Sequence, residues 1–284
     1  MRAPMLAALV LAASLLARPA LSETPADPQA VVAAERAFAR DGEAHGWAWA
    51  FRRHHAPGAL MLSDSITEAA SVLADVQGDG ENKLDWRPAY AGIARSGDLG
   101  FTTGPFLQRG GDGRALGHYF TVWRRQPDGS WKWIFDGGTG VVDPAPVSAD
   151  IAVPTLPVAT SGAPSSDAAI AAVIDREAAF ARPGNAVQKL APHLAADVRL
   201  NREGSPAAVG KDAALVLAAA DGDTRTVTLH REASLGGDLV FTLGEVRGAR
   251  DDAQPLAHFA RMWQHRNGAW HIVFDEVVPR PVKR

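Results

Sequence analysis

A histidine and an aspartate recur as a pair in two similar segments of this sequence. Residues 116–136 read LGHYFTVWRRQPDGSWKWIFD, and residues 256–275 read LAHFARMWQHRNGAWHIVFD. Turn residues divide each segment into two runs with the alternation of β-strands, which predicts two hairpins. Pairing across the turns makes His118 and Asp136 diagonal neighbours on one face, and His258 and Asp275 likewise. Such a pair can act as a general base with its orienting carboxylate, or as a structural link between strands.

Asp64 is a further candidate for acid–base chemistry, although Ser63-Asp64-Ser65 fits equally well as the cap of a following helix. His54 and His55 carry metal-ligand atoms. Adjacent helix residues point in different directions, however, and no third ligand follows at a suitable spacing. Cysteine is absent, which excludes thiolate ligands and thiol catalysis. The sequence therefore predicts neither a metal site nor a cofactor.

Four aromatic residues of the first half of the chain are candidates for the wall of a ligand pocket: Trp86, Tyr90, Trp123 and Trp133. Such side chains combine a large apolar body with one polar atom, a composition common in small-molecule sites. The alternative is that they belong to the core and to an interface between sheets.

The two halves of the chain follow one plan. The sequence separation between His118 and His258 also relates Trp123 to Trp263. An earlier pair, ERAFAR at residues 35–40 and EAAFAR at residues 177–182, occurs in the same order. Recurrence of long segments indicates a tandem duplication, and two copies are too few for a solenoid. We therefore predict one domain over residues 28–140 and another over residues 167–279, joined by a linker rich in Pro, Ala and Ser over residues 141–166.

Helical patterns precede strand patterns in both halves. In the first, helices are predicted over residues 28–46, 47–55 and 65–76, and strands over residues 58–62, 85–94, 98–108, 117–125 and 131–136. In the second, helices are predicted over residues 167–182, 184–194 and 210–220, and strands over residues 197–200, 224–234, 238–247, 256–266 and 269–278. Helices followed by an antiparallel meander predict an α+β fold with helices on one sheet face.

Both faces of the first predicted hairpin are largely apolar. With Trp123 opposite Trp133 and Thr121 opposite Phe135, one face carries Tyr119, Thr121, Trp123, Trp133 and Phe135. The other carries His118, Phe120, Val122, Ile134 and Asp136. In the second hairpin, Trp263 is expected opposite Ile272 and Arg261 opposite Phe274. A single antiparallel sheet usually exposes one face to water. One face is thus expected to pack on helices of its own domain, and the other on a second sheet, from the sister domain or from another copy in a homodimer.

The N-terminal residues follow the pattern of a secretory signal. A basic residue precedes an apolar run at residues 5–17, too short to span a bilayer, and small residues follow at positions 20–22. Removal of residues 1–22, with cleavage near Ser22/Glu23, predicts a periplasmic or secreted protein. No later stretch is long and apolar enough for a membrane span. The formal net charge of −3 and the lack of a basic run disfavour nucleic acid as a partner.

Three segments of the first half carry a family resemblance: LDWRP at residues 84–88, SGDLGFTTG at residues 96–104 and GSWK at residues 129–132. Together with the order of helices and strands, they resemble a bacterial branch of the nuclear transport factor 2-like superfamily, which includes ketosteroid isomerase and SnoaL-like cyclases. The second half keeps Gly-Asp-Leu at residues 237–239 and the hairpin but lacks the Trp-x-Pro segment. The resemblance implies a tandem pair of cones, each with a pocket between sheet and helices, and it does not imply one activity.

In isomerase-type members, the resemblance implies a catalytic carboxylate after the second helix and a Tyr on the first. Asp64 lies near the carboxylate position, but Phe38 stands near the Tyr position, which removes a donor for a developing enolate. We therefore expect a module that binds a small apolar or amphipathic ligand in the first domain, with the second domain as a packing partner. The alternatives are a proton-transfer enzyme of the isomerase, dehydratase or cyclase kind that uses Asp64 and His118, and a non-catalytic scaffold.

Overall fold

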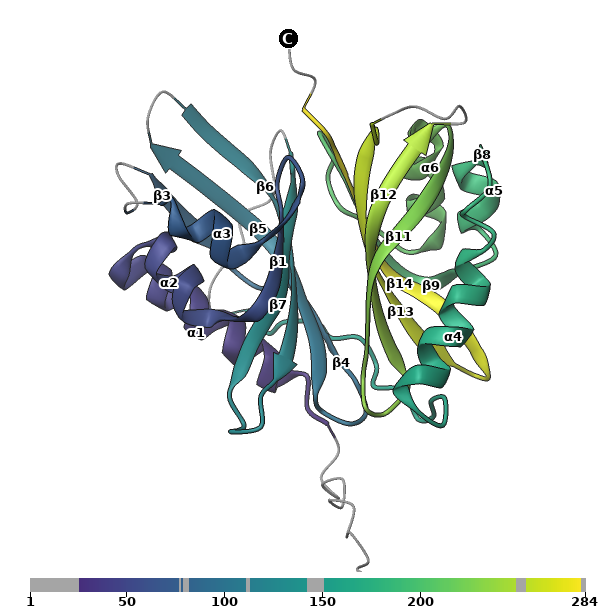
Figure 1. Ribbon diagram of the computed structural model, residues 1–284, viewed down its shortest axis with the longest axis horizontal. Helices are drawn as coiled ribbons and strands as arrows, with labels where there is room; N and C mark the ends of the chain where they lie inside the picture. The colour runs from purple at the N-terminus through teal and green to yellow at the C-terminus, as the bar shows by residue number, and fades with distance from the viewer. Residues whose placement is uncertain are drawn as a thin grey trace, which may run out of the picture.

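The computed structural model describes residues 26–76, 78, 82–110, 113–141, 151–248 and 254–281. It contains two cone-like α+β domains, each with helices on one face of a curved sheet (Figure 1). The predicted fold class is confirmed. The two sheets lie between the helices of the first domain, on the left of Figure 1, and those of the second, on the right. The predicted signal segment with its cleavage point, and linker residues 142–150, lie outside the described residues.

The first domain combines three helices with a seven-stranded sheet. Its strands follow the order β2-β1-β7-β6-β5-β3, with β4 also paired to β5, and β1 runs parallel to β7. The elements are α1 (Gln29–His45), α2 (Trp47–His54), β1 (His55–Leu62), β2 (Ile66–Glu68), α3 (Ala69–Ala74), β3 (Lys83–Trp86), β4 (Tyr90–Ile93), β5 (Leu99–Gly110), β6 (Gly113–Arg125) and β7 (Trp131–Gly140).

The second domain repeats this arrangement in the order β10-β9-β14-β13-β12-β11-β8, with β9 parallel to β14. Its elements are α4 (Ser166–Glu177), β8 (Gly184–Asn185), α5 (Ala186–Leu190), β9 (Leu194–Arg202), β10 (Ala208–Val209), α6 (Lys211–Ala218), the 3₁₀ turn η1 (Ala219–Asp221), β11 (Asp223–Ala233), β12 (Leu239–Gly248), β13 (Ala257–Arg266) and β14 (Ala269–Pro279). Within the described residues, no helix has the length and apolar character needed to cross a membrane.

Some predicted elements differ from those observed. The strand predicted over residues 85–94 is two strands, β3 and β4, because Pro88 between them has no N–H for the ladder. The helix predicted over residues 65–76 is shorter, since residues 66–68 form β2 and pair with β1. The helix predicted over residues 184–194 is reduced to α5, because residues 184–185 pair with β11.

Both predicted turns are present. Asn267 and Gly268 have φ angles of 50° and 79°, the left-handed values that a two-residue type I′ loop requires at both positions. Gly129 has φ 84°, as expected for the last residue of the longer loop in the first hairpin. The pairs nearest the turns also agree with the prediction, since Trp123 lies opposite Trp133 and Trp263 opposite Ile272.

Beyond these pairs, each hairpin contains a bulge that the sequence did not reveal. The pairing shifts between Val122 and Trp123, so that Val122 lies opposite Phe135 and Thr121 opposite Asp136. The predicted pair of Thr121 with Phe135 was therefore wrong. An extra residue in one strand transfers the following side chains to the other face, and Asp136 consequently shares a face with Thr121.

The same shift occurs in the second hairpin, where Arg261 lies opposite Asp275 instead of Phe274. The predicted His–Asp neighbours are thus separated in both domains. His118 pairs with Thr139, and His258 pairs with Val278.

The sheet face that carries Phe120 is covered by the sister domain. Phe120 stacks on Phe274 with ring centroids 3.9 Å apart and an interplanar angle of 17°. Phe101 also contacts Phe274, and Phe135 contacts Phe241 at 5.0 Å. These rings belong to one buried cluster that spans both sheets. Of the two arrangements that the sequence left open, packing within a single chain is present.

The repeated Ser/Gly-Gly-Asp turns join the domains reciprocally. The Leu235 N–H donates to Asp98 Oδ2 (3.1 Å), and the Arg95 N–H donates to Asp238 Oδ2 (2.9 Å). Linker residues 151–165 contribute to packing, because Leu156 is buried in the core that the two domains share.

Candidate functional site: an aromatic cavity in the first domain

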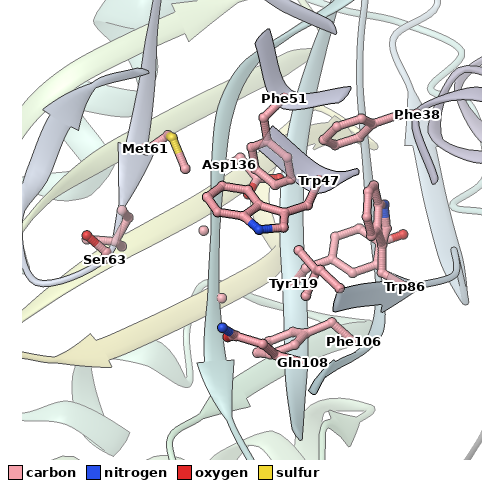
Figure 2. A pocket seen from close by; sticks show the side chains of 14 residues that line it. Phe38, Trp47, Phe51, Met61, Ser63, Trp86, Phe106, Gln108, Tyr119 and Asp136 are labelled. Atoms are coloured by element: carbon pink, nitrogen blue, oxygen red, sulfur yellow. The ribbon is translucent and has the colours of Figure 1, made fainter. Parts of the chain in front are cut away.

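A cavity of about 340 Å³ lies between the helices and the sheet of the first domain (Figure 2). In Figure 2, Phe38 and Phe51 lie above, Phe106 and Gln108 below, and Met61 and Ser63 to the left. The complete lining is Phe38, Trp47, Phe51, Met61, Leu62, Ser63, Leu84, Trp86, Phe106, Gln108, Tyr119, Asp136, Gly137 and Gly138. The wall is mainly aromatic and aliphatic, and Asp136 is its ionisable carboxyl group.

The helices supply the aromatic end of the cavity. Gly46, at φ 91°, ends α1 and lets α2 begin at once, so that both helices face the same cavity. Phe38 from α1 lies 4.8 Å from Phe51 of α2 and 4.7 Å from Trp86 of β3, both in edge-to-face geometry. Mutual ring contacts of this kind hold the wall rigid.

Asp136 enters the cavity from β7 because of the bulge. It is half-buried, and Thr121 Oγ1 donates a hydrogen bond to its Oδ2 at 2.7 Å. Burial raises the pKa of Asp136 to about 8, and the nearby Glu35 acts in the same direction. At pH 7 the carboxyl group is therefore mainly protonated and can donate a hydrogen bond.

Tyr119 is the diagonal neighbour of Asp136 on this face, because Tyr119 pairs with Gly138 and Thr121 pairs with Asp136. Its hydroxyl is buried and makes no hydrogen bond of ordinary geometry within the described part of the chain, although Thr102 lies close enough to lower its pKa. Burial raises the pKa of Tyr119 well above its ordinary value, with smaller effects of Glu35 and Asp136. The wall of the cavity thus contains two neighbouring groups that burial keeps neutral, Asp136 and Tyr119, although the Tyr119 hydroxyl itself is shielded from the open cavity.

Glu35 supports the wall from behind. The carboxylate is fully buried and accepts hydrogen bonds from Trp86 Nε1 (2.6 Å), Trp123 Nε1 (3.1 Å) and Thr102 Oγ1 (2.5 Å). Burial raises the pKa of Glu35 to about 7, while the three donors lower it. Sequence reasoning missed this residue. The available signal was that Glu35 lies on the apolar stripe of α1, between Val31 and Phe38.

The four predicted aromatic residues have different positions. Trp86 lines the cavity. Trp123 and Trp133 are fully buried in the core cluster beside it and are not among the lining residues. Tyr90 lies at the interface between the domains, with the Arg199 guanidinium 4.0 Å from its ring centroid. These three residues therefore match the core and interface alternative.

Asp64 and His118 do not converge on the cavity. Asp64 is exposed in the turn before β2, and its neighbour Ser63 lines the cavity instead. His118 alternates with Tyr119 on β6 and so lies on the face that carries Phe120. It is half-buried, and burial lowers its pKa. His118 and Asp136, which were expected to be neighbours on one face, therefore lie on opposite faces, and Tyr119 is the neighbour of Asp136 instead.

The adjacent histidines have separate partners. His54 Nε2 lies 2.7 Å from Asp41 Oδ2, and His55 Nδ1 lies 2.8 Å from the Ala56 carbonyl oxygen. Among the residues that the structure describes, no group of three or more His, Cys, Asp or Glu side chains is placed to hold a metal ion.

No protein-family model and no curated protein matches the chain. Solved structures that match include an NTF-2 like protein of unknown function from Shewanella oneidensis (11% identity, TM-score 0.34), which covers 39% of this chain and 96% of its own. A putative ketosteroid isomerase from Parabacteroides distasonis has 17% identity and a TM-score of 0.33 over 44% of this chain and 94% of its own. A hexachlorocyclohexane dehydrochlorinase of LinA type 2 has 18% identity and a TM-score of 0.32, and the match covers 40% of this chain and 86% of that protein. The likeness at these values carries no information about activity.

Proposed function

We propose that the first domain binds a small, largely apolar molecule that carries a carbonyl or a similar acceptor. The supporting observation is an aromatic cavity whose carboxyl group, that of Asp136, has its pKa raised by burial to about 8. The protonated carboxyl group of Asp136 can donate a hydrogen bond to a carbonyl oxygen of the ligand. No Lys or Arg occurs among the lining residues, so the described cavity offers no counter-charge to an anion.

The test is a competition with a neutral fluorescent probe, N-phenylnaphthylamine, displaced by acetophenone or by ethylbenzene, which has a similar shape and no carbonyl group. We expect acetophenone to bind about tenfold more tightly, the value of one additional hydrogen bond. Above pH 8 its affinity for the wild type should fall as Asp136 ionises, whereas Asp136→Asn should keep its affinity because the amide still donates. Asp64→Asn is the matched control. Equal affinity for both compounds, or no pH dependence in the wild type, contradicts the proposal.

A second candidate is proton transfer at Asp136. A carboxyl group with a pKa of about 8 inside a cavity exchanges protons near neutral pH, which suits a general acid or base. The version that uses Asp64 with His118 has no geometric support, because neither side chain is among the cavity lining. Exchange of the acetophenone methyl protons in D₂O separates the candidates: an enzyme should lose about 100-fold in Asp136→Asn, whereas a binder shows no catalysed exchange. The open cavity also favours binding over a scaffold whose cones are filled.

Export to the periplasm or beyond is part of the same proposal, supported by the signal pattern of residues 1–22. The intact mass of the chain recovered from its native compartment should correspond to a start at Glu23. A mass that includes residues 1–22 rules out this cleavage.

A further inference from the structure

The second domain has a cavity of its own, of about 270 Å³, with a different chemical character. Like the first, it lies between helices and sheet, and Phe180 stands in its wall where Phe38 stands in the first. The apolar part of the lining includes Leu190, Val246, Leu256, Phe259 and Val277. The polar part includes three cationic side chains, Lys189, Arg202 and Arg261, and one carboxylate, that of Asp221.

Arg261 occupies the position on β13 that Thr121 occupies on β6, and it is 3% exposed. Its Nε donates to Asp275 Oδ1 at 2.6 Å. Its Nη1 is buried and has no acceptor in the described part of the chain. The guanidinium also lies 4.5 Å from the ring centroid of Phe180, which orients it against the cavity wall. A buried guanidinium nitrogen without an acceptor is a position that a ligand anion can satisfy.

Two carboxylates, those of Asp275 and Asp221, contact these cations. Both already form ion pairs with Arg202 or Arg261. Arg202 Nη2 lies 2.8 Å from Asp275 Oδ2 and 2.9 Å from Asp221 Oδ2. Lys189 donates to the backbone carbonyl groups of Arg182 (3.2 Å) and Thr224, which carry no formal charge. Three cations are thus matched by two carboxylates within this set. The pKa of Lys189 is lowered by burial and then by Arg261, as expected beside excess positive charge, while the exposed Asp223 opposes this shift.

We propose that this second cavity binds a small amphipathic monocarboxylate, with the carboxylate at Arg261 and Lys189 and the hydrocarbon tail against the apolar wall. Planar guanidinium groups suit carboxylates, and most of the remaining lining residues are apolar. The duplicated domains therefore differ in ligand class, because the first cavity offers neutral donors and the second offers cations.

Isothermal titration of the mature, two-domain chain tests this with octanoate, with octanamide as an uncharged analogue, and with inorganic phosphate as an anion without a tail. We expect octanoate to bind at least tenfold more tightly than either, with an affinity that falls as salt is raised. Equal binding of octanoate and octanamide, phosphate binding as tight as octanoate binding, or no binding of octanoate overturns the proposal.

Two substitutions locate the site. Arg261→Lys keeps the charge and removes the planar fork, and Lys189→Gln removes one charge from a half-buried side chain that makes no ion pair in the described part of the chain. Each should weaken octanoate about tenfold or more. Lys132→Gln is the matched control, because Lys132 also donates to a backbone carbonyl, that of Arg53, in the first domain. If Arg261→Lys does not fold, Lys189→Gln decides. Unchanged octanoate affinity in Lys189→Gln, or an equal loss in Lys132→Gln, overturns the assignment to this cavity.

Discussion

Asp136 and Asp275 occupy equivalent positions in the two hairpins, but their surroundings are electrostatically opposite. Asp136 receives a hydrogen bond from the neutral Thr121 hydroxyl, and burial raises its pKa to about 8. Asp275 is fully buried between two cations, Arg261 at 2.6 Å and Arg202 at 2.8 Å. The contrast arises from Arg261, which stands where Thr121 stands on the facing strand, and from Arg202 on β9. One duplicated scaffold therefore holds a neutral acid in the wall of the first cavity and a buried, ion-paired carboxylate behind Arg261 in the second domain.

Asp136→Asn is expected to stabilise the protein increasingly as the pH rises from about 4 to about 9. The folded-state pKa of about 8 lies above the ordinary 3.8, so the folded chain keeps a proton that the unfolded chain releases. Wild-type stability attributable to this group is therefore greatest below pH 3.8 and is lost as the pH rises through 8. The amide avoids this loss, and the gain at pH 9 should be about 1 kcal/mol or more.

Urea unfolding at several pH values measures this difference. Asp64→Asn is the control for removal of a carboxylate at an exposed position. Its free energy of unfolding should differ from that of the wild type by the same amount at each pH. Glu35 and Glu276, whose pKa values burial raises to about 7 and about 8, remain in both proteins, and their repulsion with Asp136 acts in the same direction, so the sign of the comparison is unchanged. A pH-independent effect of Asp136→Asn contradicts the protonated state.

Asp275→Asn is expected to destabilise the protein by about 3 kcal/mol at neutral pH, the opposite sign to Asp136→Asn. The substitution leaves the buried Arg261 without its ion partner. Of its ion pairs with Asp275 and Asp221, Arg202 keeps only the second. The free energy of unfolding in urea is the measurement. Asp197→Asn removes a more exposed ion pair with Arg266 and should cost less than about 1 kcal/mol. Similar losses in both variants would disprove the role assigned to Asp275.

Glu35→Gln is expected to destabilise the first domain by about 2 kcal/mol, because an amide cannot accept from all three donors that now contact the carboxylate. The environments of Trp86 and Trp123 should change with it, which near-ultraviolet circular dichroism detects. Glu43→Gln, at an exposed position on the same helix, removes only a surface ion pair with Arg87 and should cost less than about 1 kcal/mol. A variant with wild-type stability and an unchanged spectrum would contradict this role of Glu35.

Phe120→Ala is expected to cost about 3–5 kcal/mol, because the ring is fully buried and stacked on Phe274 across the domain interface. Loss of this contact should also weaken the coupling between domains, seen as a less cooperative urea transition. Leu229→Ala removes an exposed apolar side chain and should have little effect. A cost below about 1 kcal/mol would show that the sheets do not rely on this stack.

The sequence by itself determined the duplication, the order of helices and strands, and the two turns. These features follow from short-range physics: apolar periodicity, and turn positions such as Gly129 and Asn267-Gly268 that require left-handed backbone. The two apolar faces of the first sheet could also be predicted from the sequence. Alternation along β6 places Phe120 and Tyr119 on opposite faces, whichever element covers each face.

Only the tertiary structure decided which residues meet in the cavity. A bulge between Val122 and Trp123 in the pairing moved Asp136 from the side of His118 to that of Tyr119. The local sequence pattern does not indicate this bulge, because both faces of the hairpin are apolar and either register buries similar side chains. The ion pairs of Asp275 likewise depend on β9, which is distant in sequence and parallel to β14. Periodicity and turn chemistry act over a few residues, whereas the register and the charge environment are set by packing between distant strands.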